Sequence, residues 1–263
     1  MKVNCGGMPI HIASGGRDFV TGQKTILMLH GSGQSHLTWV QQSRYFAYEG
    51  YNVIAPDLPG HGLSGGTPLQ TIEDMSDFMH ALIGQLGCGP VVFIGHSQGC
   101  LVGLDMAARY QDDLDQLVLI AGGLSIPVND YLVDASQNKL DKAINMMTGW
   151  GHSQIAHKYD NELPGHSHLG FGRALMASND VNALHADLSA CKAYGGGADA
   201  APLPFPAHPT PEFARNRSGT FRQSDTLPYP APKAPETAML CHPCHPRARM
   251  AQQMLRRHRF RRF

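Results

Sequence analysis

Long apolar runs are missing from this sequence, and their absence excludes a membrane-spanning helix. Its 263 residues contain no uninterrupted apolar stretch of the ~18 residues that such a helix needs. The segment 1–16 lacks the apolar core of a secretory signal, which favours a cytoplasmic location. The cysteines are few and scattered and make a poor disulfide framework, as expected in a reducing compartment: Cys5, Cys88, Cys100, Cys191, Cys241 and Cys244.

Valine and isoleucine are absent from one part of the chain, residues 201–263. That segment holds 11 of the 18 prolines, and it has 11 basic against 3 acidic residues, whereas residues 1–200 have 10 against 18. A segment rich in proline and without β-branched aliphatic residues is a poor source of buried strands. The net charge of zero is therefore the sum of an acidic part and a basic part. Both the charge and the amino-acid composition change near residue 200.

The remaining composition is typical of a globular protein, with 42% hydrophobic and 16% charged residues, which excludes a fully disordered chain. Short apolar runs predict four buried strands, at 25–30, 52–55, 91–94 and 117–120. Between them, one helix is predicted from a capping-box start at Thr71 to Gly87, and another over 98–110. Strands alternating with helices predict an α/β fold with a mostly parallel central sheet and flanking helices.

The alternation of predicted strands and helices stops after residue 123. Residues 124–195 contain helical stretches at about 129–148 and 172–190 and no convincing strand, which favours a helical lid inserted at the sheet. The chain is thus predicted to divide into a core (1–123), a lid (124–195) and an atypical tail (196–263). The lid histidines lack carboxylates at metal-ligand spacing, and we interpret them as ordinary lid or surface residues.

A serine stands where a strand is predicted to turn into a helix, in Gly95-His96-Ser97-Gln98-Gly99. Such a corner exposes the hydroxyl, requires small neighbours, and directs the next backbone N–H, that of Gln98, toward an oxyanion. The alternative is a strand–helix turn without chemistry. A second Gly-His-Ser-Gln, at 151–154, lacks both the closing glycine and a preceding strand, so Ser97 is the predicted nucleophile.

Two further motifs make the chain similar to the α/β-hydrolases. His30-Gly31-Ser32-Gly33 resembles their oxyanion turn, and 57–64 (Asp-Leu-Pro-Gly-His-Gly-Leu-Ser) resembles their DxPGxGxS loop. The resemblance covers roughly residues 1–200. It implies a serine hydrolase acting without a cofactor on a small ester, amide or related acyl substrate. It also implies that the amides of Ser32 and Gln98 hold the oxyanion and that Asp57 is structural.

The resemblance also implies a catalytic acid and a histidine later in the chain, in that order. The candidates are Asp225 as the orienting acid and His245 as the base. Neither has the flanking sequence that the family would give it. The 19 residues between them include five prolines, so the expected helix and strand barely fit there. The alternative interpretation is that both are incidental residues of the tail.

The tail has two motifs of its own. The segment 241–245 (Cys-His-Pro-Cys-His) matches the attachment pattern of a c-type haem and a soft metal-ligand set, but we interpret it as a chance juxtaposition because no export signal accompanies it. The arginine-rich run 247–262 has the charge to bind nucleic acid or an anionic membrane, but we interpret it as a solvated cationic end.

The change of composition at residue 200 has two explanations. One is a change of reading frame near Pro202, and the other is a divergent basic tail. Translating the encoding DNA in the other frames separates them. An apolar strand, an acid loop and a late Gly-His in another frame would favour the first.

The sequence thus predicts a serine hydrolase with a small-molecule acyl substrate, no specific nucleic-acid partner and no cofactor. The first alternative is a catalytically inactive partial hydrolase domain that lacks the acid and base of the triad. A weaker alternative is a binding protein whose basic tail engages nucleic acid. Convergence of a carboxylate and a histidine on Ser97 distinguishes the first two. The sequence does not indicate an oligomeric state or the identity of the substrate.

Overall fold

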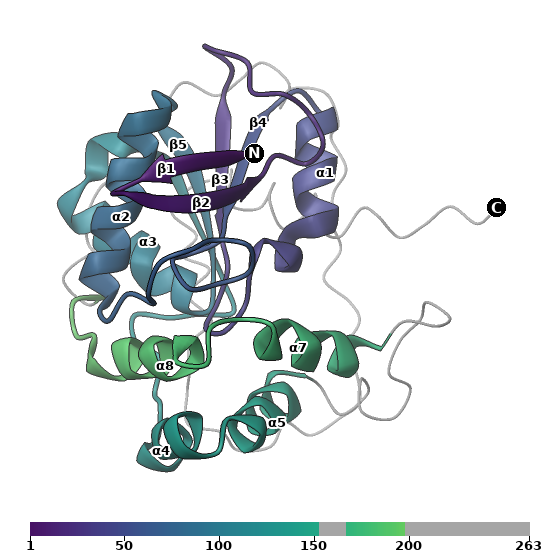
Figure 1. The fold of residues 1–263 in the computed structure, drawn as a ribbon. Helices are drawn as coiled ribbons and strands as arrows, with labels where there is room; N and C mark the ends of the chain where they lie inside the picture. Colours follow the sequence, from purple (N-terminus) through teal and green to yellow (C-terminus); the bar gives the residue numbers. More distant parts are fainter. Residues whose placement is uncertain (153–166, 198–263) are drawn as a thin grey trace, which may run out of the picture.

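A six-stranded sheet runs through the part of the chain that the computed structural model describes, residues 1–152 and 167–197 (Figure 1). The strand order is β1-β2-β4-β3-β5-β6. The first two strands pair antiparallel with their neighbours, and the other pairs are parallel. The strands are β1 (Lys2–Cys5), β2 (Met8–Ala13), β3 (Thr25–Leu29), β4 (Asn52–Pro56), β5 (Val91–His96) and β6 (Leu114–Ile120).

Helices cover both faces of this sheet, because its central strands are apolar on both sides. α2 (Ile72–Leu86) and α3 (Gln98–Arg109) pack on one face, and α1 (Val40–Tyr48) packs on the other (Figure 1). Two short 3₁₀ helices precede α1 and β6, at His36–Trp39 and Gln111–Asp113. The predicted α/β class with a mostly parallel sheet is confirmed.

The predicted ends of α2 are also confirmed. The Thr71 hydroxyl accepts a hydrogen bond from the amide of Asp74 at 3.0 Å, which satisfies one of the free donors at the start of the helix. Gly87 ends the helix in the left-handed region, at φ 57°.

The amino-terminal hairpin of β1 and β2 was not predicted. Its strands pair Cys5 with Met8, so the turn consists of Gly6 and Gly7, which have φ values of 58° and 82°. Two successive positive φ values suit the type I′ turn of a tight hairpin, and Gly-Gly is one of its sequence signals. The polar residues of the two strands weaken their apolar alternation.

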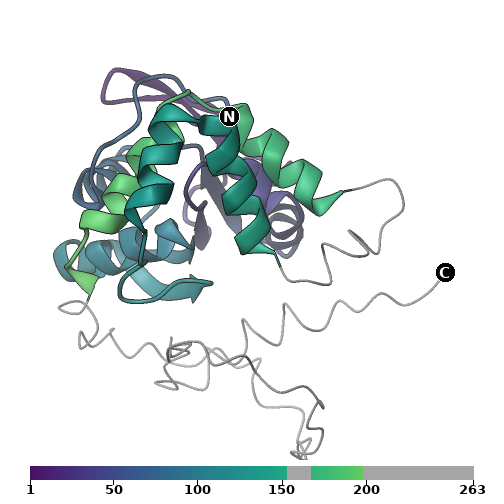
Figure 2. The same cartoon turned by 90° about the horizontal axis from the view of Figure 1, so that it is seen from below.

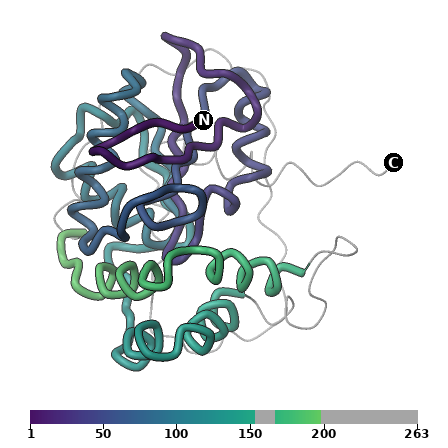
Figure 3. Tube along the Cα trace, viewed as in Figure 1, coloured from purple at the N-terminus to yellow at the C-terminus, as the bar shows by residue number. Residues whose placement is uncertain are grey.

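Four further helices gather at one end of the sheet (Figures 1 and 2). They are α4 (Asp130–Asn138), α5 (Leu140–Gly151), α7 (His168–Ala177) and α8 (Ala183–Ala193). They share a hydrophobic cluster of their own that includes Leu132, Ile144, Met176, Leu184 and Leu188. Figure 3 shows the chain leaving β6 for α4 and returning beneath the sheet as α7 and α8. Within the described parts of 124–195 there is no strand.

β6 is the last strand on one side of the sheet among the described residues, and this edge predicts self-association if the tail adds no strand to it. Within residues 1–152 and 167–197, no strand pairs with the outer side of β6, and its residues from Gln116 to Ile120 are only half-buried. A long apolar edge strand is a template for pairing with other chains. We expect a poor yield of dispersed protein and light scattering that grows with concentration. A monodisperse chain that melts cooperatively would contradict this prediction.

None of the helices among the described residues is both long enough and apolar enough to cross a membrane.

Candidate active site

Ser97 occupies the corner between β5 and α3. Its backbone has φ 51° and ψ −115°, a conformation that a residue with a side chain rarely adopts. Two hydrogen bonds hold the corner: the Ser97 amide donates to the carbonyl of Ile120 at 2.9 Å, and the Ser97 carbonyl accepts from the amide of Cys100 at 2.8 Å. The strand, turn and helix predicted around this serine are therefore present.

The two glycines that flank Ser97 are required by packing. A Cβ atom on Gly95 would lie 2.2 Å from the carbonyl oxygen of Gly99. A Cβ atom on Gly99 would lie 2.7 Å from the carbonyl oxygen of Leu29 in β3. Because the obstructing atoms belong to the backbone, neither position accepts a side chain without moving the corner.

The turn after β3 lies against this serine. A Cβ atom on Gly31 would lie 3.0 Å from the Cβ atom of Ser97. The Ser97 side chain is half-buried, and its hydroxyl forms no hydrogen bond with any residue in the described ranges. The oxygen is thus free to meet a ligand.

Two backbone amides beside Ser97 also lack acceptors. Among the described residues, neither the amide of Ser32 nor that of Gln98 has a hydrogen-bond partner. The amides on either side of Ser32, those of Gly31 and Gly33, each donate to a side chain. Gln98 is the first residue of α3, where backbone donors have no partner inside the helix and the helix dipole favours negative charge. The two predicted oxyanion donors are therefore available.

The histidines near this corner are engaged elsewhere. His30 is buried; its Nε2 atom accepts from the amide of Leu58 at 3.2 Å, and its Nδ1 atom lies 2.9 Å from the carbonyl of Gly31. His96 Nδ1 lies 3.1 Å from the Gln34 side-chain oxygen. In the part of the chain that the structure describes, no histidine hydrogen-bonds to Ser97.

The candidate base and orienting acid, His245 and Asp225, lie outside the described residues, as do the 241–245 motif and the arginine-rich run 247–262.

Asp57 anchors the loop that follows β4. Its carboxylate accepts from the amides of His36 and Leu63 at 2.6 and 2.9 Å, and a Cβ atom on Gly62 would lie 2.4 Å from one carboxylate oxygen. Burial raises the pKa of Asp57, but the hydrogen bonds from His36 and Leu63 outweigh burial and hold it below its ordinary value. These contacts support the structural role that the sequence implied.

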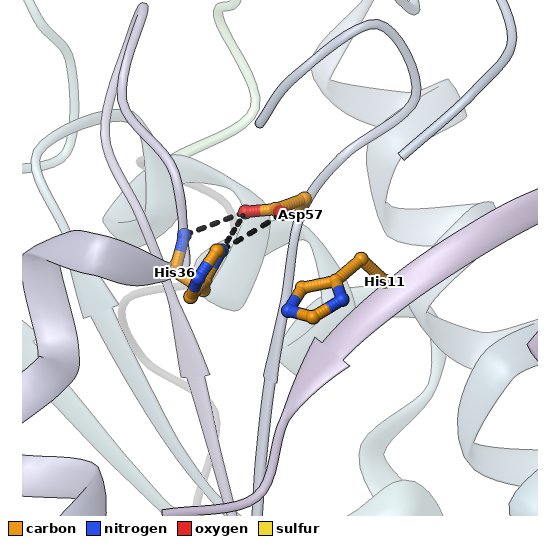
Figure 4. Close-up of side chains that lie close together, drawn as sticks. All are labelled: His11, His36 and Asp57. Carbon is orange, nitrogen blue, oxygen red and sulfur yellow. Dashed lines mark hydrogen bonds and ion pairs between the residues drawn. The ribbon is translucent and has the colours of Figure 1, made fainter. Parts of the chain in front are cut away.

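Asp57, His36 and His11 form the one group that could hold a metal ion among the described residues, with ligand atoms within 4.8 Å of one another (Figure 4). Each carboxylate oxygen already accepts two hydrogen bonds, and His36 Nδ1 faces both oxygens at 2.9 and 2.8 Å. A metal ion would have to displace His36 from the carboxylate. We therefore interpret the cluster as a structural hydrogen-bonded group.

Comparison with known proteins identifies the fold. Residues 24–154 match the family model of the α/β hydrolase fold, which spans the Ser97 corner, the turn after β3 and the Asp57 loop. The chain belongs to the α/β-hydrolase superfamily.

Curated relatives of this α/β hydrolase match it in part only. Protein ABHD8 of Homo sapiens is 33% identical over 101 residues, which cover 37% of this chain and 23% of that protein. The AB hydrolase superfamily protein YfhM of Bacillus subtilis is 31% identical over 121 residues, which cover 45% and 41%. The matches thus span less than half the length of these relatives.

Solved structures share the fold at low sequence identity. A hydrolase from Pseudomonas aeruginosa PA01 superposes with a TM-score of 0.63 at 15% identity, covering 74% of this chain and 73% of that one. The enol-lactonase from Burkholderia xenovorans LB400 superposes with a TM-score of 0.62 at 18% identity, covering 73% and 74%.

Three histidines of this α/β hydrolase, His30, His11 and His96, favour a loss of stability in acid, whereas the buried His61, whose pKa is raised, acts in the opposite sense. Burial lowers the pKa of His30 from 6.5 to about 4, and it also lowers the pKa values of His11 and His96. The unfolded chain therefore binds protons below pH 6.5 that the folded chain does not yet bind. For His30 alone, we expect the free energy of unfolding to fall by about 3 kcal/mol between pH 6.5 and pH 4. Urea titrations of the wild type and of His30→Gln at pH 7 and pH 4.5 isolate this contribution; an equal fall of the midpoint in both chains would contradict the prediction.

Sequence reasoning missed one residue beside the corner, Asp187 on α8. It is fully buried and lies close to Gly33, His61 and Gln98. Its one sequence signal is a carboxylate on the apolar face of a helix, between Leu184 and Cys191. That pattern alone does not say which groups the carboxylate meets.

Proposed function

We propose that this chain is a serine hydrolase that cleaves small esters, amides or related acyl compounds, with Ser97 as its nucleophile. One observation carries the proposal: at a positive-φ corner, the Ser97 hydroxyl and the nearby amides of Ser32 and Gln98 all lack hydrogen-bond partners among residues 1–152 and 167–197. A nucleophile with two adjacent N–H donors is what acyl transfer through a tetrahedral oxyanion requires.

In this mechanism Ser97 Oγ attacks the acyl carbon, and the carbonyl oxygen becomes the oxyanion that the amides of Ser32 and Gln98 receive. Each such donor is worth about 3 kcal/mol in comparable enzymes. His245 is the proposed base: it takes the serine proton and delivers it to the leaving group, and Asp225 orients it. Water then releases the acid from Ser97 by the same steps in reverse. The reaction needs no cofactor.

The substrate class is supported by the similar proteins. Their names include an enol-lactonase, a thermophilic esterase from Thermogutta terrifontis and (E)-2-((N-methylformamido)methylene)succinate hydrolase. The first two names denote hydrolysis of a lactone and of an ester, and the same fold accommodates many substrates. A small acyl compound is therefore the substrate class that we propose.

Turnover of p-nitrophenyl acetate, together with time-dependent inactivation by a fluorophosphonate, tests the proposal on the full-length chain. We expect saturable turnover that decays as the reagent reacts. A folded chain that neither turns over the ester nor reacts would contradict the proposal and favour a catalytically inactive partial hydrolase domain.

A further inference from the structure

The segment before and within α8 packs on the turn that would hold the oxyanion. The Asn179 side chain donates to the carbonyl of Gly33 at 2.7 Å and accepts from the amide of Gly62 at 2.8 Å. Leu184 touches the same glycine closely, since a Cβ atom on Gly33 would lie 2.9 Å from its Cδ1 atom. In Figure 1, α8 lies between the sheet and the pair α4 and α5. Residues 179–187 therefore pack against the turn 31–34 and hold it through hydrogen bonds and an apolar contact.

Asp187 is the centre of this contact. One carboxylate oxygen accepts from the amide of Gly33 at 2.7 Å and lies 3.0 Å from Nε2 of His61. The other accepts from the side-chain nitrogen of Gln98 at 3.1 Å. Three donors thus converge on one carboxylate that is 0% exposed. A buried carboxylate is tolerated only with such compensation.

His61 supplies the compensating charge. Its Nδ1 atom lies 3.0 Å from the carbonyl of Pro59, and its Nε2 atom faces Asp187, so both ring nitrogens meet acceptors. A neutral imidazole has a single N–H, whereas the protonated ring has two and satisfies both acceptors. Burial opposes the charged form of His61, but the carboxylate of Asp187 outweighs it and raises the pKa of His61. The pair is therefore a buried ion pair with no net charge.

The contacts of Asp187 join the two halves of the proposed oxyanion site. Gly33 directly follows Ser32, and the amides of Ser32 and Gln98 are the two that have no acceptor among the described residues. We propose that Asp187 is a positioning residue that fixes these two amides relative to each other, with His61 keeping its charge neutral. This inference rests on the proposed function of Ser97.

Two substitutions test the positioning role. Asp187→Asn removes the charge and keeps the shape. Gln98→Met removes the hydrogen bond that the Gln98 side chain donates to Asp187, and it leaves the backbone amide of residue 98 in place. Since Gln98 Oε1 is buried without a partner among the described residues, methionine also removes an unsatisfied polar atom, and we expect that variant to fold. Asp141→Asn, at an exposed aspartate of α5, is the charge-matched control.

The readouts are kcat and KM for p-nitrophenyl acetate, the rate of fluorophosphonate labelling, and the melting midpoint. We expect Asp187→Asn to lower kcat and the labelling rate by about 10-fold or more, with KM changed by less than about threefold, because the amides act on the oxyanion and not on the bound ester. Gln98→Met should lower both rates in a chain that still melts cooperatively, at a lower midpoint because Asp187 loses one of its three donors. The Asp141→Asn control should match the wild type. If Asp187→Asn does not fold, Gln98→Met decides.

The outcomes separate the two proposals. Wild-type rates in folded Asp187→Asn and Gln98→Met would overturn the positioning role and leave Ser97 as the proposed nucleophile. The same would follow if KM rose while kcat stayed constant. A wild-type chain that is folded but never labelled would overturn the proposed function and this inference with it.

Discussion

Ser97→Ala is expected to reduce turnover of p-nitrophenyl acetate to the uncatalysed rate, a loss of at least about 10³-fold. The reason is chemical: alanine removes the attacking oxygen but keeps the corner between β5 and α3. The small side chain fits the same half-buried position, and the backbone bonds to Ile120 and Cys100 do not involve the hydroxyl. The fold should therefore survive, and circular dichroism measures that directly.

The chain offers a matched control for this variant. Ser153 stands in the second Gly-His-Ser-Gln of the sequence, which follows α5 and not a strand. Ser153→Ala is expected to retain wild-type turnover. Loss of turnover in Ser153→Ala with retention in Ser97→Ala would mean that the nucleophile has been placed at the wrong repeat.

Gly95→Ala is expected to destabilise the chain by more than about 3 kcal/mol, the second large effect. The added methyl group would lie 2.2 Å from the carbonyl oxygen of Gly99 and 2.8 Å from the amide nitrogen of Cys100. Both atoms belong to the first turn of α3, so relief requires the helix to move away from β5. Because Ser97 lies between these elements, activity should fall together with stability.

Gly84→Ala is the matched control for that substitution. Gly84 lies on the exposed side of α2, and apart from its chain neighbours and the adjacent helix backbone no atom of the described residues is within 4 Å of the position where its Cβ would stand. Alanine there should stabilise the chain by about 0.5–1 kcal/mol, since it reduces the freedom of the unfolded helix segment. Urea unfolding measures both variants. Equal midpoints for Gly95→Ala and the wild type would contradict the packing argument.

The fold was predictable from sequence where local patterns agree with tertiary packing. The strands at 25–30 and 91–94 are continuous apolar runs, and both are central in the sheet, so burial on both faces left a clear signal. The helix from Thr71 to Gly87 was predictable because its cap residues act locally. The hairpin of β1 and β2 was missed because these two short strands carry polar residues that weaken the apolar alternation.

The candidate site was predictable only in its local part. Ser97, Ser32 and Gln98 belong to short motifs whose backbone geometry is fixed by nearby glycines. Asp187 is 154 residues from Gly33 and 126 from His61, and no pattern within α8 indicates those partners. Contacts of that separation come from the packing of α8 against the turn after β3 and against α3, and no local pattern of the sequence indicates them.

The most direct test of the central claim is to locate the fluorophosphonate adduct. The full-length chain is labelled, digested and sequenced by mass spectrometry, beside Ser97→Ala. If Ser97 is the nucleophile, one equivalent of adduct is found on Ser97, and none forms on the alanine variant. An adduct on another serine, or a folded wild-type chain that carries none, would contradict the account.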